Sequence, residues 1–168
     1  MSARLRLERL ALGHRLGSCR TGDPEIDHYL HHAARIEQAQ GLAAVHVAVD
    51  RHDAVVGFFT LSPLSLRADS RLHHLLGRNG LPYPQLGGFL LGRMGVDRAR
   101  QGKGIGGELI ELAAHTSAAH ITHVGGAFLA VDPKSDTLVS YYERFGFVRI
   151  DPTGVRRRML RTLRVLVR

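Results

Sequence analysis

The segment VDRARQGKGIGGELIEL, residues 96–112, has the composition of an anion-binding turn. An apolar run ends at Val96, and four glycines between positions 102 and 107 precede a regular helical pattern. Glycine allows sharp turns and a close approach of the backbone to a ligand, and the first amides of a helix attract anions. The pattern therefore predicts a phosphate-binding turn between a strand that ends at Val96 and a helix that begins at Gly104.

Three kinds of phosphate-binding turn compete for this segment. The Walker loop requires Ser or Thr after its lysine, and Gly104 follows Lys103, so that loop is excluded. Residues 102–107 match the dinucleotide fingerprint G-x-G-x-x-G. That fingerprint opens a series of βαβ units, however, whereas antiparallel strands are predicted to come first in this chain. The third interpretation takes Gln101–Gly106 as Gln-x-x-Gly-x-Gly.

This third pattern and a second motif about 35 residues later resemble the GCN5-related N-acetyltransferases (GNAT). The second motif comprises Val131-Asp132 and the segment Ser140–Phe147, which reads SYYERFGF. The resemblance implies an α/β fold with a mixed, mostly antiparallel central sheet flanked by helices and a V-shaped splay between its middle strands. It also implies that acetyl-CoA is the cosubstrate, with its pyrophosphate on the glycine turn.

The resemblance assigns roles to individual residues of this chain. The backbone of Met94, Gly95 and Val96 is expected to bind the pantetheine arm. The residues expected to hold the pyrophosphate are Gln101, Gly102, Lys103, Gly104, Ile105 and Gly106. Tyr142 is the expected general acid, because the pKa of a tyrosine, about 10, is close to that of a thiol, about 8.5. The alternative is that Tyr142 only packs on its helix.

Three further segments resemble one branch of this family, the tRNA-acetylating toxins of bacterial type II toxin–antitoxin modules. They are Thr21–Leu30, Val55–Ser62 and Leu90–Asp97. The branch acetylates the free α-amino group of aminoacyl-tRNA and so blocks translation. It implies aminoacyl-tRNA as substrate, a ribbon-helix-helix antitoxin as partner, and a homodimer. Asp23 and Gly95 stand where the branch often has Asn and Ala. An acetyltransferase for a small-molecule amine or a protein N-terminus is the alternative.

The charge of the chain agrees with a polyanionic partner. Lys and Arg total 23 against 15 Asp and Glu, a formal net charge of +8. Lysine occurs only at Lys103 and Lys134, and the planar fork of arginine suits phosphate. Arg93 interrupts an apolar strand and Arg78 falls in a long connection, and both are expected to bind tRNA. The alternatives are a buried ion pair for Arg93 and a solvated position for Arg78.

The length of 168 residues fits a single domain, residues 1–168. Strands are expected near residues 5–10, 43–49, 54–61, 89–96, 127–131, 147–150 and 158–167. Helices are expected near residues 23–40, 70–77, 104–118 and 137–144. Residues 66–87 are interpreted as a long connection that contains the second of these helices.

Location and metal content are predicted from what the sequence lacks. No stretch approaches the roughly 18 apolar residues of a membrane span, and the first residues have no apolar signal-peptide core, so a cytoplasmic protein without a membrane partner is expected. The single cysteine excludes zinc sites of the Cys-x-x-Cys type. Five histidines that lie close together in two groups along the chain are interpreted as surface residues. No metal is expected, because no third converging ligand is evident. The five histidines are His28, His31, His32, His73 and His74.

Overall fold

A computed structural model describes residues 5–77, 82–151, 154 and 156–165 of the chain. In chain order the elements are β1 (Arg6–Arg9), α1 (Pro24–His28), the π-helical turn η1 (Tyr29–Ala33), α2 (Ala34–Ala39), β2 (Ala44–Val49), β3 (Val55–Arg67), α3 (Ser70–Leu75), β4 (Gln85–Val96), the 3₁₀ turn η2 (Arg98–Arg100), α4 (Ile105–Val124), β5 (Phe128–Val131), α5 (Asp136–Glu143), β6 (Val148–Arg149) and β7 (Met159–Thr162).

The strands form a seven-stranded sheet in the order β1-β2-β3-β4-β5-β7-β6. The pairs β1–β2, β2–β3, β5–β7 and β6–β7 are antiparallel, and β4–β5 is parallel. This confirms the predicted mixed, mostly antiparallel sheet. The chain divides into two compact units, residues 1–62 with 91–113 and residues 63–90 with 114–168, and each is described by itself.

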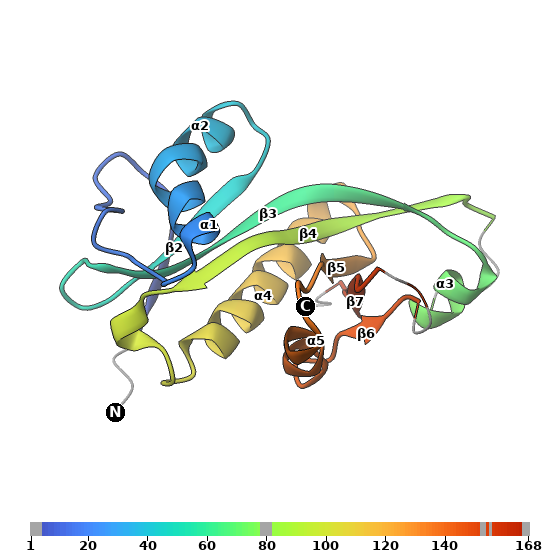
Figure 1. Ribbon diagram of the computed structural model, residues 1–168. Coiled ribbons are helices and arrows are strands. Elements are labelled where there is room, and N and C mark those ends of the chain that lie inside the picture. The colour runs from blue at the N-terminus through green and yellow to red at the C-terminus, as the bar shows by residue number, and fades with distance from the viewer. Residues whose placement is uncertain (1–4, 78–81, 152–153, 155, 166–168) are drawn as a thin grey trace. The chain divides into compact units, whose positions relative to one another are not determined.

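In the first unit, β3 carries helices on both of its faces (Figure 1). The ring of Phe58 stacks on the ring of Tyr29 in η1, with 6.3 Å between the centroids. A Cβ built on the preceding residue, Gly57, would lie 3.0 Å from Cδ1 of Leu109 in α4. Successive strand residues point to opposite faces of a sheet. The α1–α2 segment and the first part of α4 therefore pack on opposite faces of β3.

The predicted helix at residues 23–40 begins where expected but is not regular throughout. The carboxylate of Asp23 accepts hydrogen bonds from the amides of Glu25 (2.9 Å) and Ile26 (3.3 Å), which caps the helix. A π turn then separates α1 from α2, with the amide of Ala34 bonded to the carbonyl of Tyr29. Such a turn holds one extra residue and shifts the helical phase. The uninterrupted helix predicted from the apolar spacing is thus wrong at this turn.

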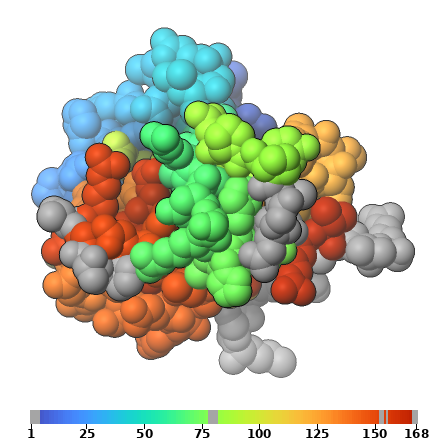
Figure 2. Space-filling model, turned by 90° about the vertical axis from the view of Figure 1, so that its right-hand side faces the viewer, coloured from blue at the N-terminus to red at the C-terminus, as the bar shows by residue number. Residues whose placement is uncertain are grey.

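In the second unit, β5 lies between β4 and β7. Its parallel register with β4 pairs Phe89 with Leu129 and Leu90 with Ala130 and covers no further residues of the two strands. Gly88 is required where β4 passes the core, because a Cβ there would lie 2.5 Å from the ring of Phe128. The α3 helix and the end of β3 lie on the face shown in Figure 2, next to the segment that carries β6.

Several elements differ in length from the predictions. β3 continues to Arg67 and β4 begins at Gln85, so both ends of the predicted connection at residues 66–87 are strand, and α3 lies between them. Pro63 and the alternating serines obscured a strand in which Leu64 and Leu66 face the core. α4 extends to Val124, and β7 ends at Thr162. None of the helices in the described part of the chain has both the length and the apolar composition that a membrane span requires.

Candidate active site

The turn between β4 and α4 is held in shape by the side chain of Gln101. Its Nε2 donates to the carbonyl of Thr21 (2.7 Å) and to the carbonyl of Val96 (3.0 Å). Gly102 and Gly104 have φ angles of +77° and +82°. A Cβ on either glycine would meet no atom within 4 Å, so the backbone conformation, not crowding, requires glycine here.

Consecutive amides of this turn are available to a ligand. Among the described residues, none of the N–H groups of Gly102–Gly107 has a hydrogen-bond acceptor, and the first bonded amide is that of Glu108, which donates to the carbonyl of Gly104 (3.1 Å). The turn is exposed from Gln101 to Gly104. The dipole of the 20-residue helix α4 adds positive potential at its N-terminus. This is an arrangement that can bind adjacent phosphate groups.

Contacts with residues 20–21 fix the base of the turn. The amide of Asp97 bonds to the carbonyl of Val56 (2.9 Å), which continues the β3–β4 edge. The carboxylate of Asp97 accepts the amide of Arg20 (3.0 Å), and the carbonyl of Arg20 accepts the amide of Arg98 (2.7 Å). These positioning residues were not predicted from the sequence. An aspartate directly after the strand, at the start of the turn, was the signal that could have found Asp97.

An ion pair ties the turn to the β2–β3 hairpin. Nη2 of Arg100 lies 2.7 Å from Oδ2 of the buried Asp50. The other carboxylate oxygen of Asp50 accepts the amides of His52 (2.8 Å) and Ala54 (3.1 Å). The amide of His52, then burial, the amide of Ala54 and Arg100 act on this carboxyl, and its pKa is lowered overall. Asp50 therefore orders the hairpin and holds the residue that precedes Gln101.

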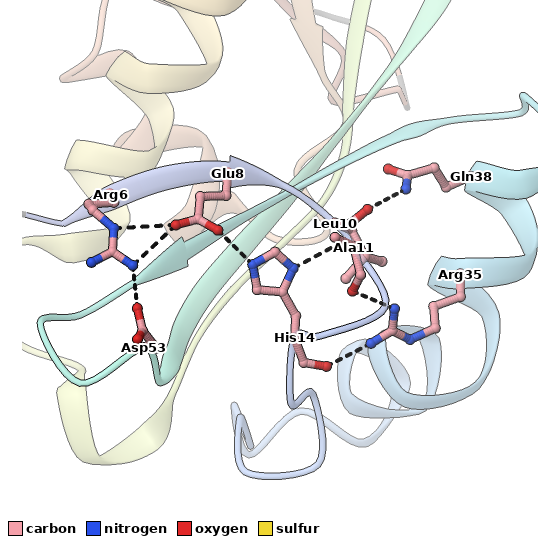
Figure 3. A network of polar contacts seen from close by, with 8 residues as sticks. All are labelled: Arg6, Glu8, Leu10, Ala11, His14, Arg35, Gln38 and Asp53. Atoms are coloured by element: carbon pink, nitrogen blue, oxygen red, sulfur yellow. Dashed lines mark hydrogen bonds and ion pairs between the residues drawn. The ribbon is translucent and has the colours of Figure 1, made fainter.

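The N-terminal segment that leads to Arg20 is itself anchored to α2 and β1 (Figure 3). Arg35 donates to the carbonyls of Ala11 and His14, both at 2.7 Å. Nδ1 of His14 accepts the amide of Ala11 (2.9 Å), so its Nε2 carries the hydrogen that is donated to Glu8 (2.9 Å). Arg6 bonds to the same glutamate and to Asp53. These contacts hold the polypeptide that supplies the Thr21 carbonyl.

The predicted pantetheine-binding residues Met94–Val96 end β4 and are half-buried. They lie beyond Leu90, the last residue of β4 in the register with β5. Gly95 is closely packed, since a Cβ there would lie 2.6 Å from Cγ2 of Thr21 and 2.9 Å from Cγ2 of Ile26. This crowding explains why glycine, not alanine, occupies the position.

Arg93 stacks on an aromatic ring. Its Cζ lies 5.1 Å from the centroid of the Tyr29 ring, and the Tyr29 hydroxyl donates to Glu37 (2.9 Å). The backbone amide of Arg93 bonds to the Thr60 hydroxyl (2.9 Å). Nε of Arg93 is buried without a partner, and no carboxylate among the described residues forms an ion pair with this side chain. The ion pair considered for Arg93 is therefore not found there.

Tyr142 lies on α5 in the second unit. Its ring meets Tyr141 and Phe147 edge-on, with centroids 5.7 Å and 5.5 Å away. Burial, with a smaller effect of Tyr141, raises the pKa of Tyr142 to about 12. The pKa of Tyr142 is thus further from that of a thiol than the ordinary tyrosine value, because the ring lies in an apolar environment. The hydroxyl is a protonated donor throughout the neutral range.

The remaining predicted residues have different outcomes. Arg78 lies outside the described residues. The run Arg156–Arg158 precedes β7, and its last residue, Arg158, forms a two-pronged ion pair with Asp132. His73 is buried, with Nε2 3.0 Å from the carbonyl of Tyr83, so its assignment to the surface is wrong. Three or more metal-ligating side chains do not cluster anywhere in the part of the chain that the structure describes.

The sequence of this chain is similar to those of known acetyltransferases. A family model described as an acetyltransferase (GNAT) domain matches residues 41–149. A tRNA-acetylating toxin of Mycobacterium tuberculosis is 31% identical over 136 residues, which are 79% of this chain and 77% of that protein.

Solved structures share the fold at lower identity. AtaT complexed with acetyl-methionyl-tRNAfMet aligns with a TM-score of 0.83 and 18% identity over 95% of each chain. AtaTR bound with AcCoA aligns with a TM-score of 0.79 and 19% identity over 94% of this chain and 93% of that one. The family match covers both motifs around Gln101 and Tyr142. This chain therefore belongs to the GNAT acetyltransferase family and is an N-acetyltransferase.

Proposed function

We propose that the chain transfers the acetyl group of acetyl-CoA to the α-amino group of aminoacyl-tRNA and thereby inhibits translation as the toxin of a toxin–antitoxin pair. The observation that carries this substrate is the 31% identity to a tRNA-acetylating toxin across 79% of the chain. The net charge of +8 supports it, because tRNA binding requires neutralisation of phosphates.

The described residues fit the cosubstrate at its pyrophosphate. The unpaired amides of Gly102–Gly107 and the positive end of α4 suit two linked phosphates. The backbone of Met94–Val96 would bind the pantetheine arm and polarise the acetyl carbonyl. Acetyl-CoA, when bound, supplies a thioester that an amine can attack directly.

Tyr142 is the proposed proton donor to the leaving sulfur. With a pKa of about 12, its hydroxyl is fully protonated at neutral pH. Because a thiol titrates near about 8.5, complete proton transfer from so weak an acid is unfavourable. The hydroxyl therefore acts first as a hydrogen-bond donor that stabilises negative charge on the sulfur. Over the whole step the amine nitrogen loses one proton and the sulfur gains one, so the products are the amide and the CoA thiol. The Tyr141 and Phe147 rings hold the phenol in place.

The acceptor amine requires no strong general base. The α-amino group of an aminoacyl ester titrates near or below about 7.7, so much of it is neutral at physiological pH. A lysine side chain, near about 10.4, would require a base. This difference favours aminoacyl-tRNA over a protein lysine as the acceptor.

Arg93 and Arg78 are the proposed tRNA contacts. The guanidinium of Arg93 is held by the Tyr29 ring and is not neutralised by a carboxylate among the described residues. An oriented arginine of this kind suits the phosphates at the acceptor end. Replacing Arg93 should weaken acetylation of tRNA and leave acetyl-CoA binding intact; loss of acetyl-CoA binding would contradict this role.

The partners are proposed from relatives. AtaT has been solved bound to the C-terminus of the antitoxin AtaR, and KacTA with DNA. For this chain we propose a ribbon-helix-helix antitoxin and a homodimer in the cytoplasm. Co-expression with a neighbouring antitoxin gene should restore growth that the chain alone arrests.

The decisive experiment offers labelled acetyl-CoA and competing acceptors to the purified protein. The acceptors are a mixed pool of charged tRNA, uncharged tRNA, free amino acids, and a peptide with a free N-terminus. We expect label on charged tRNA alone, and a loss of roughly 100-fold or more with Tyr142→Phe. Label on amino acids or the peptide instead would replace the toxin proposal with the alternative, a small-amine or N-terminal acetyltransferase.

A further inference from the structure

A cavity of about 770 Å³ is lined by residues of the second unit, and Tyr142 is not among its lining residues. Its walls are the end of β3, the α3 helix, the residue after β5, and the described residues 150–151 and 156–158 between β6 and β7. Figure 2 looks onto this face, where the green surface of β3 and α3 adjoins the orange-red surface of the β6–β7 segment. Four arginines line it, Arg67, Arg156, Arg157 and Arg158.

Two of these arginines are already paired. Nε and Nη2 of Arg158 each lie 2.7 Å from a different oxygen of Asp132. Nε of Arg157 lies 3.0 Å from Oδ1 of Asp136. The pair between Arg158 and Asp132 has two parallel hydrogen bonds, so its geometry is well defined. These contacts hold the β6–β7 segment against the end of β5 and the start of α5, so they shape the cavity wall.

The other two arginines are not neutralised by an ion pair among the described residues. Arg67 and Arg156 are exposed, and neither has a carboxylate partner among the described residues. Two carboxylates, Asp132 and Asp151, line the cavity against four guanidinium groups, so positive charge predominates. The donors of these two side chains are therefore available to an anionic ligand.

The cavity also has an apolar wall. Leu72 is buried at 4% exposure, and Leu66 and Ile150 pack on the same core around Phe128. Proteins bind single-stranded RNA by neutralising its phosphates with basic side chains and by stacking unpaired bases on aromatic rings or arginine planes. The lining residues include no aromatic ring, so a base here would pack on the aliphatic side chains and on guanidinium planes. The volume is in the range of pockets that take ligands of nucleotide size.

We infer that this cavity binds the single-stranded 3′ end of tRNA, with a base on Leu66, Leu72 and Ile150 and phosphates on Arg67 and Arg156. This inference rests on the proposed function, because it supplies the place where the charged end of that substrate is held. An acidic peptide from a protein partner is the other ligand that the charge would allow, and the test includes it.

The test measures binding with uncharged RNA, so that it does not depend on acetyl transfer. Fluorescence anisotropy gives Kd over a range of salt concentrations for three probes: whole tRNA, the same tRNA without its last four nucleotides, and an acidic peptide. The variant is Arg67→Ala/Arg156→Ala. The matched control is Arg15→Ala/Arg164→Ala, which removes two exposed arginines that do not line the cavity. Thermal melting confirms that both variants fold.

For whole tRNA we expect the cavity variant to bind at least tenfold more weakly than wild type, and the slope of log K against log salt to fall by about 1.4, or 0.7 for each lost single-strand phosphate contact. The Kd of the control variant for whole tRNA should change less. The cavity variant and the control should bind trimmed tRNA with equal Kd.

Three results would overturn the inference. The cavity variant and the control could bind whole tRNA with equal Kd, or the cavity variant could lose as much affinity for trimmed tRNA as for whole tRNA. The third is a loss of affinity that is confined to the acidic peptide. Failure of the proposed function is separate, since it would show as wild-type protein that does not label charged tRNA.

Discussion

At position 142 a phenol is packed between two aromatic rings and keeps its proton well above neutral pH. Because its pKa is raised to about 12, the donor form is lost only as the pH rises through that value. We expect kcat for aminoacyl-tRNA to show no decline between about pH 8 and pH 10. Initial rates measured over that range test this.

Tyr142→Phe keeps the packing and removes the donor, so it should lower kcat by roughly 100-fold at every pH and change KM for acetyl-CoA little. Tyr141→Phe serves as the control. A wild-type decline with a midpoint near pH 9 that disappears in Tyr142→Phe would show that the phenol titrates much lower than the structure indicates.

Gly95 tests close packing at the residue scale. In Gly95→Ala the new methyl would meet Thr21 at 2.6 Å and Ile26 at 2.9 Å. Overpacking of this kind costs about 1–3 kcal/mol in the free energy of unfolding. Gly87→Ala is the matched control, because a Cβ there meets no atom within 4 Å. Urea denaturation of both variants measures the difference, and equal stabilities would refute the argument.

At the scale of elements, the turn before α4 depends on a left-handed residue. Gly104 has a φ of +82°, and an L-residue there is strained by about 1–2 kcal/mol. Gly104→Ala should therefore raise the Kd for acetyl-CoA roughly tenfold, because the strain displaces the amides that bind phosphate. Calorimetric titration with acetyl-CoA measures this directly. Gly17→Ala, at an uncrowded glycine outside the turn, should bind like wild type.

The ion pair between Asp50 and Arg100 connects two elements and belongs to the same scale. Asp50→Asn keeps an oxygen for the amides of His52 and Ala54 and removes the charge that holds Arg100. We expect KM for acetyl-CoA to rise severalfold while kcat is kept. Arg100→Gln should have a similar effect, and the double variant should be no worse than either single one.

The lowered pKa of Asp50 gives this ion pair a pH dependence. Its stabilising effect is complete above the ordinary pKa of an aspartate, about 4, and is lost as the pH falls through the lowered value. If the increases in KM for acetyl-CoA were additive in the Asp50→Asn/Arg100→Gln double variant, the two side chains would act separately and not as an ion pair.

At the scale of the whole molecule, the net charge of +8 makes substrate binding depend on salt. We expect kcat/KM for aminoacyl-tRNA to fall steeply between about 50 and 200 mM salt, since each phosphate contact releases counterions. The KM for acetyl-CoA should change much less over the same range, because a pyrophosphate carries few charges. A rise in the KM for acetyl-CoA as large as the fall in kcat/KM for aminoacyl-tRNA would mean that salt acts on the fold and not on tRNA binding.

Some features follow from short stretches of sequence alone. Asp23 and Pro24 start a helix whatever surrounds them, because an aspartate caps the amides that follow it. The glycines at 102 and 104 mark a left-handed turn for an equally local reason, since few other residues adopt positive φ without strain. The order of strands and helices, the mixed sheet and the membership of the acetyltransferase family were all predictable at this level.

Only the tertiary structure decided which distant residues support the site. Thr21 and Gln101 are 80 residues apart, and Asp50 and Arg100 are 50 apart. A local pattern cannot reveal such pairs, because they form only when strands from different parts of the chain come together. The same holds for the environment that raises the pKa of Tyr142, for the ring under Arg93 and for the arginine-lined cavity. Burial and the choice of partner are properties of the packed molecule, whereas capping and backbone turns are properties of the segment itself.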